Sequence, residues 1–123
     1  MTQKLQTELG SINISEDVIA TICGVAAMEC YGLVGMASRN VQDGISDFLR
    51  KDYYERGVDV QYIDDHIVSV TLYIIVEYGV KISEVARNIQ ERVKYAIENT
   101  IGLDVESIDI RVQGVRVTDA KRK

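Results

Sequence analysis

The chain has 123 residues, of which 46% are hydrophobic and 27% charged, with neither proline nor tryptophan. These proportions exclude collagen-like and disordered chains, and the length suits a single globular domain spanning residues 1–123. A chain of this size can fold around its own core without a stabilising disulfide or metal ion.

The net charge of -5 is unevenly distributed. Residues 111–123 carry five basic side chains against Asp119, a local net charge of +4, which leaves -9 on the first 110 residues. Because an acidic body repels phosphate backbones, general nucleic-acid binding is not expected. We expect the basic tail, 118–123, to be flexible and either solvated or in contact with an acidic partner or anionic lipid.

Neither a secretory signal nor a membrane-spanning helix is predicted. The amino terminus begins with alternating polar residues, and the longest uncharged stretches, 18–28 and 66–76, have eleven residues each. A spanning helix needs about 20. We therefore expect a cytoplasmic protein that has no transmembrane segment of its own.

The first apolar pattern predicts one strand from Leu5 to Ile14. Leu5 and Leu9 lie in one phase of the alternation, whereas Ile12 and Ile14 lie in the other. Because Gly10–Ser11 separates the two phases, we interpret this point as a glycine-marked β-bulge that keeps the apolar side chains on the core face.

A helix with Ser15 as its N-cap is predicted to run to Cys30. Only Thr21 and Glu29 are polar between Val18 and Cys30, so this helix is more apolar than one buried face requires. Small side chains form a second stripe at helical spacing. The stripe consists of Ala20, Gly24 and Ala27. Either the following segment of the same chain covers it, or it is an interface for self-association.

The segment Gly32–Gly35 has the G-x-x-G form that KH modules use to bind nucleic acid. Its middle residues, Leu33 and Val34, offer no charge to a phosphate, so we expect a flexible loop after the helix. A short helix is expected next, and it presents Val41, Ile45, Phe48 and Leu49.

The pair Tyr53–Tyr54 lies between Arg50 and Arg56. Tyrosine and arginine together are typical of protein interfaces, so this pair is a candidate interface. The alternative is that these rings pack against the protein's own hairpin.

Alternating apolar residues from Val58 to Val76 predict a two-stranded hairpin that turns at Asp64–Asp65. One face of the return strand is wholly apolar and belongs to the core. The other face is mixed and includes Tyr73 and Ile75. We expect that a partner partly covers this second face.

A long helix follows, with Ser83 as its N-cap and Gly102 just past its end. Its single apolar stripe indicates that it lies on a sheet. The predicted fold is α+β: a two-layer sandwich with a mostly antiparallel four-stranded sheet and helices on one face. The expected order is strand, helix, short helix, strand, strand, helix, strand.

The final strand shows the same shift in side-chain alternation as the first. Ile108 and Val112 share one phase, and Val115 and Val117 resume in the opposite phase after Gln113–Gly114. We predict a second glycine-marked bulge there, which keeps the apolar residues on the core face.

The sequence offers few side chains that could support catalysis or metal binding. His66 is the single histidine, so the chain alone cannot supply a zinc site with paired histidines. Cys23 and Cys30 lie about 10 Å apart along one helix, too far to form a disulfide, and an apolar helix makes a thiol inert. The pair Asp64–Asp65 fits a turn better than a metal loop. We expect no catalytic residue, no metal and no cofactor.

Four segments, Gly10–Ile22, Gly32–Met36, 76–86 and Val112–Val115, form an ordered set that resembles the alkaline shock protein family of Gram-positive bacteria. The resemblance extends from Gly10 to Val117. Its motif residues include Glu77, Tyr78, Gly79, Gln113 and Gly114. It implies a small, non-enzymatic cytoplasmic protein in cell-envelope stress response and homeostasis. Some members are held at the membrane by a separate anchoring partner, and some are linked to fatty-acid metabolism.

The first functional hypothesis is therefore an interaction or scaffold protein that forms homo-oligomers. The alternative is a KH-like RNA-binding protein that uses Gly32–Gly35 and the basic tail. An enzyme would require His66 to meet a carboxylate in a cleft.

Overall fold

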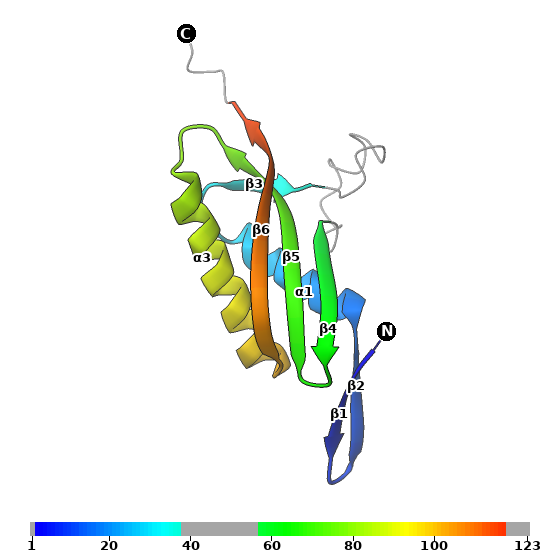
Figure 1. The fold of residues 1–123 in the computed structure, drawn as a ribbon. Helices are drawn as coiled ribbons and strands as arrows, with labels where there is room; N and C mark the ends of the chain where they lie inside the picture. The colour runs from blue at the N-terminus through cyan, green and yellow to red at the C-terminus, as the bar shows by residue number, and fades with distance from the viewer. Residues whose placement is uncertain (1, 38–56, 118–123) are drawn as a thin grey trace.

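The structure, a computed structural model, describes residues 2–37 and 57–117 (Figure 1). Its strands are β1 (Thr2–Thr7), β2 (Gly10–Ser15), β3 (Leu33–Met36), β4 (Val58–Asp64), β5 (Ile67–Glu77) and β6 (Asp104–Arg116). Its helices are α1 (Glu16–Met28) and α3 (Ile82–Tyr95), and the π-helical segment η2 (Ala96–Ile101) continues α3. The α+β class is confirmed. The expected short helix over residues 41–49 and the pair Tyr53–Tyr54 lie outside the described residues, as does the tail.

Strand β5 is the centre of the main sheet. It pairs with β3 and β4 in antiparallel orientation and with β6 in parallel orientation. The predicted hairpin of β4 and β5 is confirmed, and Asp64 Oδ1 accepts a hydrogen bond from the backbone N–H of His66 at its turn, at 2.8 Å. A parallel pair needs a crossover, which α3 provides between β5 and β6.

Strands β3 and β4 lie end to end along the same edge of β5. The backbone of Tyr73 joins them: its N–H donates to the Gly57 carbonyl at 2.7 Å, and its carbonyl accepts from the Ala37 N–H at 2.8 Å. The chain therefore leaves this edge at Ala37 and returns to it at Gly57, next to the point of departure.

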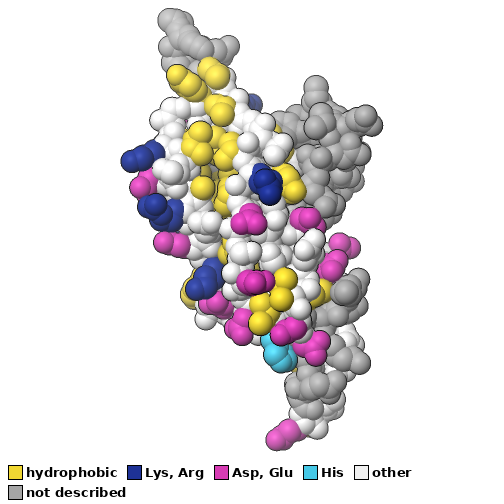
Figure 2. All heavy atoms as spheres, in the orientation of Figure 1, with side chains coloured by type: hydrophobic (Ala, Val, Ile, Leu, Met, Phe, Trp, Pro, Cys, Tyr) yellow, Lys and Arg dark blue, Asp and Glu magenta, His cyan; other side chains and the backbone are white. Residues whose placement is uncertain are grey.

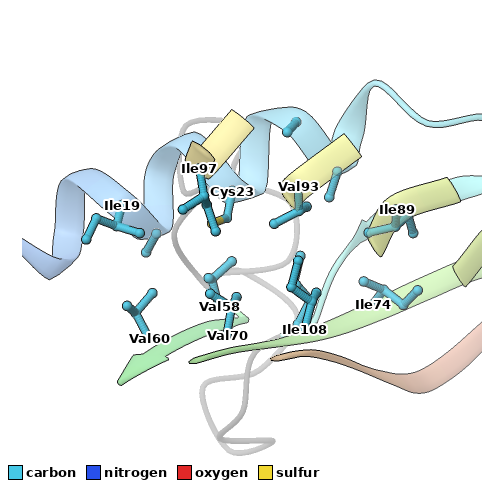
Figure 3. Close-up of a cluster of buried hydrophobic side chains, with 14 of the residues drawn as sticks. Ile19, Cys23, Val58, Val60, Val70, Ile74, Ile89, Val93, Ile97 and Ile108 are labelled. Atoms are coloured by element: carbon cyan, nitrogen blue, oxygen red, sulfur yellow. The ribbon is translucent and has the colours of Figure 1, made fainter. Parts of the chain in front are cut away.

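The core lies between the sheet and a layer formed by α1 and α3 (Figures 1 and 3). Every second side chain of β5 faces this layer and is fully buried. These side chains are Val68, Val70, Leu72, Ile74 and Val76, each 0% exposed. Ile19 and Cys23 of α1 and Val93 of α3 point toward them (Figure 3). Burial of each such aliphatic side chain contributes about 1.5–3 kcal/mol.

The prediction of a single bulged strand at the amino terminus is wrong. Thr7 pairs with Gly10, so residues 2–15 form a separate β1–β2 hairpin. A tight turn and a bulge both displace the side-chain alternation, which is why the sequence pattern fitted either. The hairpin projects beyond the end of the main sheet (Figure 1).

The expected loop at Gly32–Gly35 is also wrong. Leu33–Met36 is strand β3, and the Gly32 carbonyl accepts a hydrogen bond from the Glu77 N–H at 3.0 Å. The segment is therefore part of the sheet and does not form a G-x-x-G loop between helices.

Of the four predicted helix ends, Ser15 and Gly102 are confirmed, whereas α1 ends at Met28, two residues before Cys30. Ser15 caps α1, accepting from the Val18 N–H at 3.3 Å, and Gly102 ends η2 with φ 92°. Ser83 is not the N-cap of the second helix, because Lys81 holds the extended cap position and its carbonyl already accepts from the N–H groups of Glu84 and Val85.

The predicted bulge in the last strand is confirmed, because the register between β5 and β6 shifts at Gln113. Its expected consequence is wrong in part. Val112 and Val115 do lie in register with buried Ile74 and Val76, yet they are 37% and 46% exposed.

The junction at Gly57 gives a first prediction. A Cβ at Gly57 would lie 2.3 Å from the Ala37 carbonyl oxygen, and its φ is +82°. Gly57→Ala should therefore lower the free energy of unfolding by about 2–4 kcal/mol. Gly79→Ala is the matched control, because φ is +101° there but a Cβ would meet nothing within 4 Å. Its expected cost is about 1–2 kcal/mol. Equal losses in urea unfolding would contradict the close approach of Ala37 to Gly57.

Candidate functional site

The small-residue stripe of α1 is not a surface. Ala20 is 6% and Ala27 0% exposed, and Gly24 is buried as well. Helix α1 contacts β3 and β4 of the sheet and also lies against α3 and η2. Of the two alternatives for this stripe, the self-association interface is therefore wrong, because the chain itself encloses these residues.

The sheet face opposite the helices is the candidate site. In β5 it carries Ser69, Thr71, Tyr73, Ile75 and Glu77, which alternate with the buried core residues. Their partners in register on β6 are Ser107, Asp109, Arg111, Gly114 and Arg116. We call these ten residues the open face. In Figure 1 the described helix α1 lies behind the sheet, and Figure 2 views the open face directly.

The two strands of the open face are tightly coupled. Ser69 Oγ and Ser107 Oγ lie 2.9 Å apart and share a hydrogen bond. Tyr73 and Ile75 lie on this face at intermediate exposure, where the alternation placed them. That a partner covers them stays a prediction.

Charge changes sign along the open face. Asp109 on β6 lies next to Thr71, which also pairs with Asp59 of β4, whereas Arg111 and Arg116 follow further along β6. Figure 2 shows acidic side chains concentrated toward the lower half of this side of the molecule. The charge pattern alone places both arginines in the basic segment 111–123 and does not indicate a sheet surface. The alternation of Asp109 and Arg111 with Ile108, Ile110 and Val112 could have placed them there.

The two motif segments of the resemblance meet in space. Gly114 lies in register with Ile75, and the Tyr78 N–H donates to the Arg116 carbonyl at 2.9 Å. Glu77, Tyr78, Gly79, Gln113 and Gly114 thus gather where β5 and β6 end. Gly79 turns the chain toward α3 with φ +101°.

The reactive side chains considered above are not brought together. Burial raises the pKa of the Cys23 thiol from 9.0 to about 12, and burial also raises the pKa of Cys30, which Arg92 partly opposes. His66 is exposed in the β4–β5 turn. Within residues 2–37 and 57–117 there is no cluster of three metal-binding side chains. Across the same ranges no helix has the length and apolar character needed to cross a membrane.

The buried thiol predicts a pH-dependent stability. Above about pH 9 the unfolded Cys23 releases its proton, while the folded thiol keeps it until about pH 12. The stabilisation is therefore complete below pH 9 and falls by about 1.4 kcal/mol per pH unit above it. Urea unfolding between pH 8 and about pH 10.5 should show this slope for the native chain and a shallower slope for Cys23→Ala. Parallel slopes would contradict burial of the thiol.

The chain is similar to a solved protein domain and to two bacterial proteins. A variant of the MamM carboxyl-terminal domain aligns with 81% of this chain and 98% of its own length, at a TM-score of 0.49 and 15% identity. The chain is 52% identical over 120 residues to the uncharacterized protein YloU of Bacillus subtilis strain 168, covering 97% of this chain and 99% of that protein. It is 47% identical over 118 residues to the uncharacterized protein Spy1614 of Streptococcus pyogenes serotype M6, covering 95% and 97%.

The family model confirms the resemblance found in the motif segments. It matches residues 4–117, from the β1–β2 hairpin to the end of β6. The chain belongs to the alkaline shock protein 23 family, whose function is related to the cell envelope.

Proposed function

We propose that this protein is a non-enzymatic interaction protein that serves cell-envelope homeostasis and the envelope stress response from the cytoplasm. The open face is the observation that supports this role most directly. It is a rigid surface of ten residues on two paired strands, and it combines Tyr73 and Ile75 with charged groups. Tyrosine and arginine are the side chains that interfaces favour.

The chemistry of the open face defines the partner. A protein surface that docks here would place basic groups near Asp109 and Asp59 and acidic groups near Arg111 and Arg116. Opposite charges of this kind select the partner and its orientation more than they raise the affinity. A membrane-anchored protein with such a surface would hold the chain at the envelope.

A binding role fits the remaining side chains better than a catalytic one. A thiol whose pKa is raised to about 12 stays protonated and is a poor nucleophile. The RNA-binding alternative loses its main support, since residues 33–35 of this segment belong to strand β3.

A charge swap tests this proposal in cells. Asp109→Arg with Arg111→Asp reverses the polarity of the open face without changing the net charge. Glu84→Arg with Arg87→Glu is the matched control, because this exposed α3 pair lies 3.5 Å apart. Each chain would replace YloU in Bacillus subtilis. Survival under a cell-wall antibiotic and membrane fatty-acid composition would then be measured.

We expect the swap on the open face to reduce survival to that of a strain without the protein, while the control swap survives like the native chain. Fatty-acid composition should stay unchanged. Full survival of the open-face swap, or of the strain without the protein, would contradict the proposal. A changed fatty-acid composition with normal survival would favour the lipid-metabolic role instead.

A further inference from the structure

The β1–β2 hairpin, residues 2–15, is an arm that projects from the molecule (Figure 1). Within the described part of the chain, β1 pairs with β2 and with no other strand. The arm is held at its base, where Ile14 packs against the core and its carbonyl accepts from Tyr62 Oη at 3.1 Å. At its far end the side chains of Leu9 and Ile12 are 100% and 51% exposed. A two-stranded hairpin alone is only marginally stable in water, so such an arm gains from packing against another surface.

A second exposed apolar surface lies at the opposite end of the main sheet. It consists of Tyr78, Ile82, Val112, Val115 and Val117, which are 37–70% exposed. We call it the pole patch. Val112 and Val115 lie in register with Ile74 and Val76, on the core side of β6.

The backbone at the pole patch is also able to accept a strand. The Arg116 carbonyl bonds to Tyr78 and therefore points toward β5. Because backbone groups alternate in direction along a strand, the N–H and carbonyl of Val115 point away from β5. Among the residues that the structure describes, β6 pairs only with β5. An edge of this kind is a template for strand addition.

The arm end is acidic, and the patch end has a small excess of basic side chains. Asp64, Asp65 and Asp104 lie at the end from which the arm projects, because Asp64 and Asp104 both pair with Ile67. Lys81 and Arg116 border the pole patch, and Glu77, which is in register with Arg116, offsets one of these two positive charges. The arm end of one copy therefore complements the patch end of another.

We propose that the arm of one copy docks on the pole patch of a second copy. Within the described residues β2 pairs only with β1, so the outer edge of β2 can add to the outer edge of β6. Ile12 of β2 and Leu9 of the adjoining turn then lie beside Val112 and Val115. The inference rests on the proposed interaction role and names a second copy of this chain as one partner. Because arm and patch are different surfaces of one chain, the contact is heterologous and repeats head to tail or closes into a ring.

Sedimentation velocity of two complementary variants tests this contact. Leu9→Asp with Ile12→Asp disables the arm, and Val112→Glu with Val115→Glu disables the patch. The native chain at high micromolar concentration should sediment as an oligomer, and each double variant alone as a monomer. An equimolar mixture retains one intact arm and one intact patch, so it should form a one-to-one dimer and nothing larger.

Tyr95→Asp is the control variant, because Tyr95 is 65% exposed on α3 and belongs to neither surface. It should assemble like the native chain. Far-ultraviolet circular dichroism checks that every variant is folded. A monomeric native chain, double variants that still assemble, or a mixture that stays monomeric would overturn the proposal.

Binding to vesicles that contain anionic lipid tests whether a lipid surface, and not a second copy of the chain, occupies the pole patch. A monomeric native chain that binds these vesicles, with binding lost in the Val112→Glu and Val115→Glu chain, would assign the patch to a lipid surface and overturn self-docking. Assembly in solution depends on neither the open-face charge swap nor cell survival. The docking contact and the proposed envelope role can therefore fail independently.

Discussion

Strand β5 constrains the rest of the main sheet because both of its edges are occupied and one of its faces is fully buried. β6 pairs along its whole length on one edge, and β3 and β4 share the other. A shift of one residue would turn Val70 and Leu72, each 0% exposed, toward the open face. The burial that stabilises the core therefore also fixes which side chains the opposite face presents.

The sequence was sufficient where one local signal has one structural solution. The alternation over β5, the Ser15 cap and the αL residue Gly102 are such signals, and each agrees with the structure. The phase shift at Gly10 has two solutions, a bulge within one strand or a turn between two. The same signal at Gln113 is a bulge because β5 lies beside it as a partner. Only the tertiary neighbours distinguish these cases.

Helix α1 also shows what a sequence pattern leaves undetermined. A helical stripe tells which residues are apolar, but not how many neighbours surround the helix. Ala20 and Ala27 are buried because α1 contacts both the sheet and the second helix, so its surplus of small apolar residues serves close packing inside one chain. β3 was missed for a related reason, since four residues that include Gly35 are too few to establish an alternation.

The fold leaves its interaction capacity in places that core packing does not use. Ser69 and Arg111 lie on the open face and make no buried contact with the described helices. Their side chains are therefore available for recognition without a cost to core packing. The arm contacts the body at Ile14 and Tyr62, and its tip is not part of the main sheet. In the two proposed contacts, the open face and the projecting arm bind different partners. Taken together, the two proposals describe a small protein that links an envelope component to further copies of itself, with Arg116 of β6 at the border of both surfaces.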